Sequence, residues 1–221
     1  MKRTITVKGV GSVSAKPDYI TLTLSITEKD MDYEKALEGA ARRIAQLEGA
    51  AEEAGFEKGA LKTLHFNVNT QYEGVRDKDG NYQNVFAGYA CLYRLKLAFG
   101  LDSKRLAAVL TAVAGSGAEP ELNISFTVKE PARVSEALLA SAAANAREKA
   151  QVLCRASGVE LGKLIRIDYS WDELNLVSPT RYELADCAMP LMAAGKRCAP
   201  EIQPDDIDLH DTAAFVWELE G

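Results

Sequence analysis

Two stretches of this chain alternate strictly between apolar and polar residues. From Tyr19 to Thr27, the even-numbered positions are isoleucine or leucine and the odd-numbered positions from Thr21 onward are threonine or serine. The run 122–128 repeats this alternation with apolar residues at its even positions. A period of two with one polar face predicts strands of a sheet that packs on one side only.

The same reasoning predicts further strands over 4–14, 61–72, 84–99, 165–171 and 210–219. In the stretch 61–72 we expect Leu64, Phe66, Val68 and Tyr72 to face inward. The polar positions His65, Asn67, Asn69 and Gln71 would then face outward. The intervening Asp77-Lys78-Asp79-Gly80-Asn81 is typical of a hairpin turn.

Apolar residues at helical spacing predict long helices over 32–54 and 131–157, and a short one over about 102–115. Asp102 is placed to cap the short helix, and Pro131 suits the first turn of the second long helix. Gly55 and Gly158 follow the long helices at the position where glycine adopts a left-handed conformation.

Residues 54–61 and 157–164 share a pattern, in which Gly55, Glu57 and Gly59 correspond to Gly158, Glu160 and Gly162. The sequence therefore predicts an α+β fold of duplicated βαββ units, with antiparallel sheet and the long helices packed on one face. Pseudo-repeats of about 15–100 and 118–221, joined by the helix at about 102–115, would form a single body over 1–221.

Gly9 and Gly11 suggest a phosphate-binding loop, but no helix follows them. A bulged or bent strand explains them better.

Composition narrows the function. The 221 residues are 47% hydrophobic and carry a net charge of −6, which allows a substantial core and argues against nucleic-acid binding. No apolar run reaches the length of a membrane helix, and the N-terminus has no signal-peptide pattern. We expect a cytoplasmic protein as the chain is given, and a periplasmic or extracellular one if a leader was removed.

Candidate chemistry is sparse, and we expect no cofactor. Asp206, Asp208 and His210 alternate and are weak candidates for a divalent metal, although a solvated strand entry is the simpler interpretation. His65 is a candidate general base, as histidines often are, but no Ser, Cys or Asp lies beside it in sequence. The four cysteines form no CxxC pair. Cys91 and Cys154 suggest buried thiols, whereas Cys187 and Cys198 flank one loop and are either free or paired.

A long stretch without periodicity, residues 172–206, separates the last two predicted strands. A loop of this length is functional or disordered in most compact domains. Its apolar residues Met189, Leu191 and Met192 suggest either a docking segment or a loop tucked onto its own core.

Three stretches of the chain resemble the SIMPL family, a domain of largely unknown function that includes bacterial periplasmic immunogenic proteins. They are Ile5-Thr6-Val7-Lys8-Gly9-Val10-Gly11 through Pro17-Asp18 to Ile26, Ala144-Asn145-Ala146-Arg147-Glu148-Lys149-Ala150 through Gly162, and Pro200 through Pro204 with Val216-Trp217-Glu218-Leu219. The resemblance implies an α+β fold, a tendency to self-assemble into homo-oligomers, and a loose link to envelope and oxidative stress. It implies no catalytic residues.

We therefore expect a non-enzymatic self-assembling or protein-interaction protein. A small-molecule or metal-binding module is the first alternative, and an uncharacterised hydrolase or redox enzyme is the second.

Overall fold

The alternating strand at Tyr19–Asp30 (β2) lies inside a four-stranded sheet, with its apolar face buried. The computed structural model describes residues 3–76, 82–170, 174–181 and 202–221. Ile20, Leu22, Leu24 and Ile26 are at most 1% exposed, which confirms the predicted inward face of this strand.

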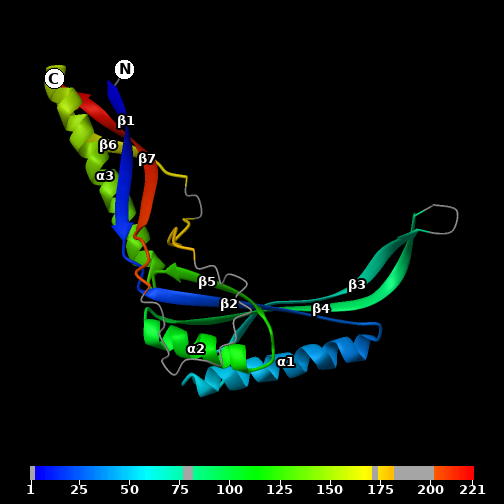
Figure 1. Ribbon diagram of the computed structural model, residues 1–221. Coiled ribbons are helices and arrows are strands. Elements are labelled where there is room, and N and C mark those ends of the chain that lie inside the picture. Colours follow the sequence, from blue (N-terminus) through cyan, green and yellow to red (C-terminus); the bar gives the residue numbers. More distant parts are fainter. Residues whose placement is uncertain (1–2, 77–81, 171–173, 182–201) are drawn as a thin grey trace. The chain divides into compact units, whose positions relative to one another are not determined.

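The elements follow one another as seven strands and three helices among the described residues. Their order is β1 (Thr4–Ala15), β2, α1 (Tyr33–Glu53), β3 (Lys62–Arg76), β4 (Tyr82–Gly100), α2 (Ser103–Gly115), β5 (Glu121–Thr127), α3 (Pro131–Ala156), β6 (Glu160–Asp168) and β7 (Ile207–Glu220). The fold is α+β, as predicted, and the strands form two antiparallel sheets (Figure 1).

The chain divides into two compact units. Unit 1 comprises residues 1–18, 126–180 and 204–221, and unit 2 comprises 19–125 and 181–203. Unit 1 contains the sheet β1-β7-β6, and the sheet of unit 2 has the order β3-β4-β2-β5. The antiparallel pairing agrees with the prediction, but the division of the strands into two sheets was not predicted, because pairing between distant segments leaves no local signal in the sequence.

The predicted duplication is not shown by this topology. A second βαββ copy would place β5 beside β7, as β2 lies beside β4. Instead β5 extends the sheet of unit 2 at β2, and the N-terminal strand β1 pairs with β7 from Thr4↔Glu218 to Ala15↔Ile207. Gly55 and Gly158 both adopt positive φ after their helices, but Gly59 has positive φ whereas its predicted counterpart Gly162 lies within β6, so the shared pattern marks similar helix ends only.

In unit 1, α3 packs against β1 and β7 along a stripe of small residues. Two core clusters lie at this interface, one around Ala146, Phe215 and Trp217 and the other around Leu138 and Ile207. A side-chain Cβ at Gly9 or Gly11 would overlap backbone oxygens of α3. The register of β1 is unbroken, so these glycines permit close helix packing rather than the bulge that the sequence suggested.

In unit 2, α1 packs on β2 and β4, and α2 packs beside α1. Asp32 caps α1 by accepting hydrogen bonds from the backbone N–H groups of Glu34 and Lys35. Asp102 caps α2 in the same way, and Pro131 opens α3, as predicted. Strand β6 begins at Glu160, five residues before the predicted 165, and so replaces part of the predicted turn.

Candidate interaction surface

The hairpin formed by β3 and β4 extends past the N-terminal end of α1, so part of its helix-side face is uncovered (Figure 1). Nearer the core, Cys91 on this face packs on Ala36 and Ala40 of α1. Val68 pairs with Cys91, and Tyr72 lies four residues further along β3, so Tyr72 shares that face. At 60% exposed, Tyr72 has no helix over it.

Aromatic side chains line this uncovered face in a connected row. The ring centroids of Tyr72 and Phe86 lie 6.0 Å apart, and those of Phe86 and Tyr89 lie 5.3 Å apart. Further out, the Arg76 guanidinium stacks 4.8 Å from the ring centroid of Tyr82, which is 70% exposed. We call Tyr72, Tyr82 and Phe86 the aromatic face of the hairpin.

This exposure corrects the sequence prediction for β3. The alternation placed Leu64, Phe66 and Tyr72 inward, but they are 52%, 48% and 60% exposed, and only Val68 packs against the core. The alternation identified the correct face of the strand. It could not show that α1 packs on β2 and β4 rather than on the edge strand β3, or that the hairpin extends past the N-terminal end of α1.

The two sheets have four edge strands, and two of these edges are partly covered. Beside β1, the backbone N–H of Val10 donates to Asn145 Oδ1 of α3 at 3.0 Å, and the N–H of Ser12 donates to Ser141 Oγ at 3.2 Å. At β5, Thr127 bridges to Val177, and the Ser178 N–H donates to the Phe126 carbonyl at 2.8 Å. These groups satisfy the edge of β1 at two of its backbone N–H groups, and at β5 they cover the C-terminal end of the strand, so both edges are partly closed to pairing.

The edges of β3 and β6 have no such cover among the described residues. Strand β6 is interrupted by two register shifts, and Lys163 and Arg166 lie within it. Bulges and charges of this kind protect an edge from pairing. On β3, by contrast, the run from His65 to Arg76 has no extra residue of its own, because the shift near Gln71 comes from β4.

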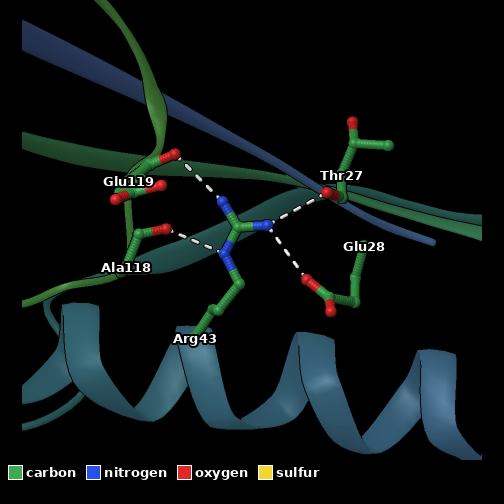
Figure 2. Close-up of polar contacts among 5 residues, drawn as sticks. All are labelled: Thr27, Glu28, Arg43, Ala118 and Glu119. Atoms are coloured by element: carbon green, nitrogen blue, oxygen red, sulfur yellow. Dashed lines mark hydrogen bonds and ion pairs between the residues drawn. The ribbon is translucent and has the colours of Figure 1, made fainter. Parts of the chain in front are cut away.

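The densest polar cluster of unit 2 surrounds Arg43 of α1 (Figure 2). Its guanidinium donates to the carbonyl oxygens of Ala118, Thr27 and Glu119 at 2.8, 3.0 and 2.9 Å, and to Glu28 Oε2 at 3.1 Å. Glu119 has φ of 46°, an unusual value for a residue other than glycine. Three of the four acceptors are backbone carbonyls, so Arg43 holds the turn before β5 against β2.

Cys91 lies opposite Glu28 in the pairing of β2 with β4, close to this cluster. Burial, and to a lesser extent the negative charge of Glu28, raises the pKa of the Cys91 thiol. Burial and then Cys91 likewise raise the pKa of Tyr93. A reactive cysteine needs the opposite shift, so this thiol is suited to packing rather than to nucleophilic chemistry.

An open groove of 540 Å³ runs between α1 and α2. Small residues line most of it, and the polar groups are those of Gln46, Glu53, Thr111 and Ser116. Glu53 is the one titratable residue in this lining and is exposed, so the groove lacks the cluster of titratable groups that a catalytic site uses.

The structure does not gather the predicted metal candidates into a site. Asp208 and His210 are exposed on β7, opposite Ser14 and Ser12 of β1, and Asp206 precedes the strand. Within residues 3–76, 82–170, 174–181 and 202–221, no three His, Cys, Asp or Glu side chains come together to hold a metal ion. His65 is exposed on β3 opposite Arg94.

Several predicted residues lie outside the described ranges. These are Met189, Leu191 and Met192 of the predicted docking loop, together with Cys187 and Cys198. Cys91 and Cys154 are buried free thiols, as predicted. The sequence predicted no role for Asn145 at the β1 edge, and the signal for that role was its spacing of four from Ser141 on α3.

None of the helices described is long and apolar enough to span a membrane.

Comparison with known proteins agrees with the resemblance noted in the sequence. Residues 5–217 match the SIMPL family, described as a protein of unknown function (DUF541). The chain is 25% identical over 163 residues to the 26 kDa periplasmic immunogenic protein of Brucella melitensis biotype 1, and 24% identical to its namesake from Brucella abortus (strain S19). Both alignments cover 74% of this chain but only 65% of the relative's length.

A solved structure, the regulatory subunit of aspartate kinase from Thermus flavus, aligns over 98% of this chain and 90% of its own at 11% identity. The TM-score is 0.18, which is too low to indicate a common fold. The family match extends over nearly all of the residues described above, and the chain therefore belongs to the SIMPL family of proteins of unknown function.

Proposed function

We propose that this protein is a non-enzymatic, self-assembling member of the SIMPL family, and that it assembles through the aromatic face of the β3–β4 hairpin. The observation that carries the proposal is the exposure of Tyr72, Tyr82 and Phe86 on the part of the hairpin that none of the described helices covers. Contiguous exposed apolar surface is costly in a monomer and is typical of an interaction site. Tyrosine is also enriched at protein interfaces.

The free energies of aromatic burial and of association favour a partner that also supplies backbone hydrogen bonds. Burying the exposed part of each aromatic side chain contributes about 1–2 kcal/mol. Association costs about 4–15 kcal/mol in lost rotational and translational freedom. Three aromatic side chains therefore do not support a stable assembly alone, and a strand edge beside them is a suitable further contribution.

The alternatives have less support. An enzyme would use a cleft with titratable groups free to act. The Arg43 guanidinium is engaged with backbone carbonyls, and the Cys91 thiol is buried with a raised pKa. A metal-binding module would need a cluster of ligands, whereas Asp208 and His210 are exposed along β7 and Asp206 is half-buried before the strand.

Native mass as a function of concentration tests the proposal. Light scattering after size-exclusion chromatography should show a mass above that of the 24.0 kDa monomer. The double substitution Tyr72→Ser and Phe86→Ser should reduce that mass towards the monomer. Val152→Ser on α3 is the matched control, because Val152 is also half exposed but lies on another element.

Circular dichroism should show that each variant retains the fold. A wild-type protein that stays monomeric at high concentration contradicts the proposal. The predicted docking loop is tested in parallel by Leu191→Asp with Met192→Asp. If only this pair lowers the mass, assembly uses the loop and the hairpin proposal is wrong.

A further inference from the structure

The open edge of β3 is long and regular. Its residues on the two sides of Asn69 are complementary in charge and polarity when two copies of the strand run antiparallel. Accepting self-assembly as proposed above, we infer that β3 pairs antiparallel with β3 of a second copy, centred on Asn69. The two four-stranded sheets would then join into one continuous sheet across a twofold axis. The inference names both the partner and the register of the interface.

The unpaired N–H and C=O groups of an exposed strand edge can form hydrogen bonds with the backbone of another strand. An exposed edge therefore favours the addition of a strand. Of the four edges, that of β1 is covered by α3, and that of β5 is short and is bridged at its C-terminal end. Two bulges and two basic residues interrupt β6. Among the described residues, β3 offers the longest uninterrupted edge, from His65 onward.

A strand that pairs antiparallel with its own copy has few permitted registers. Alternate residues direct their N–H and C=O groups either to β4 or to the open edge. Only residues of the same parity can face each other across the twofold axis, so the pairing must be centred on a residue rather than between two. The shift at Leu64 also limits the regular pairing to the run from His65.

Centring on Asn69 matches the two copies by charge and by polarity. It sets His65 of one copy opposite Glu73 of the other, twice by symmetry. On the helix-side face it sets Phe66 opposite Tyr72. These residues are exposed in the single chain, so the pairing would bury apolar area and place an imidazole beside a carboxylate.

The opposite face is matched as well. Asn67 lies opposite Gln71 in this register, and Asn69 lies opposite its own copy, so amide side chains face amide side chains. Centring on Thr70 instead would place Phe66 opposite Gly74, and centring on Val68 would place Glu73 opposite Thr63. Neither keeps the charge match, and both separate the two aromatic rings. The charge and aromatic complementarity favours a second copy over an unrelated strand.

Cysteine cross-linking tests the register directly. Opposed Cα atoms in an antiparallel pair lie about 4.5–5.5 Å apart, within the range that a disulfide spans. Asn69→Cys should therefore form a covalent dimer under mild oxidation. The parent chain should carry Cys187→Ser and Cys198→Ser, since Cys91 and Cys154 are buried and protected.

Asn67→Cys is the matched control, because two copies of residue 67 would lie four residues apart, or about 13 Å. Alone it should not cross-link, but mixed with Gln71→Cys it should give the heterodimer. At least tenfold faster cross-linking of Asn69→Cys than of Asn67→Cys supports the inference. Equal rates overturn it.

The native mass separates this test from the one above. If the protein assembles but Asn69→Cys gives no covalent dimer, the proposed self-assembly stands and the proposed β3–β3 register is wrong. If the protein stays monomeric, both the proposed self-assembly and the proposed register are wrong. Near-native circular dichroism of each cysteine variant shows that the strand is intact.

Discussion

At the scale of single residues, Arg43 shows how a charged side chain can organise backbone. Its guanidinium joins α1, β2 and the turn before β5 through four hydrogen bonds, and it is only 23% exposed. Nothing in the sequence distinguishes it from Arg42, the exposed arginine beside it. Its partners at 27–28 and 118–119 are far apart in the chain, so sequence periodicity cannot reveal them.

We expect Arg43→Ala to lower the free energy of unfolding by about 2–4 kcal/mol, because several carbonyl groups and Glu28 lose their donor. The stability of Arg43→Lys should lie between those of the wild type and Arg43→Ala, since a single ammonium group cannot reach the carbonyls of β2 and those of the turn before β5 at once. Arg42→Ala should change stability by less than about 0.5 kcal/mol. Urea unfolding followed by circular dichroism measures all three, and equal effects at positions 42 and 43 would refute this role.

At the scale of elements, the close approach of β1 to α3 depends on two glycines. Alternation predicts β1 well, and the helical stripe Leu138, Ala142, Ala146 and Ala150 predicts the buried face of α3. The contact between β1 and α3 could not be predicted, because a glycine within a strand can mark either a bulge or the close approach of a helix. The sequence around Gly9 does not distinguish these two cases. The exposure of the hairpin was missed for a related reason, since burial depends on where a covering helix ends.

We predict that Gly9→Ala lowers the free energy of unfolding by about 1–3 kcal/mol, because its methyl group would press on the backbone of Ala142. Gly49→Ala is the opposite control. No atom lies within 4 Å of the added group at Gly49, which sits within α1. That change should stabilise the protein by about 0.5–1 kcal/mol. Thermal unfolding measures both, and a neutral Gly9→Ala would show that the helix can move away.

At the scale of the whole molecule, the sequence predicts the types and order of the elements more accurately than their partners. The predicted helices and strands are present, with β6 starting early, because each depends on local periodicity and capping. Sheet membership differs because it depends on pairing between segments far apart in the chain. The candidate site was predictable to the same extent. The sequence predicts the strands that form the edges, but it does not show which edges are covered by α3 and by residues 174–180.

The pairing of β1 with β7 has a consequence for synthesis on the ribosome. Thr4 is synthesised long before its partner Glu218, because the two residues lie at distant positions in the chain. At about 5–20 residues per second, β1 waits roughly 10–40 s for β7. The strands of the other sheet all lie within 19–127 and meet much sooner.

An arrested chain that ends before Ile207 should therefore show slow amide exchange in β2 and β4 but fast exchange in β1. Protection of β1 in that chain would mean that α3 alone can hold it. Either way, nascent β1 remains without the strand that completes its sheet until β7 is made, and chaperones that bind extended segments have that interval in which to act.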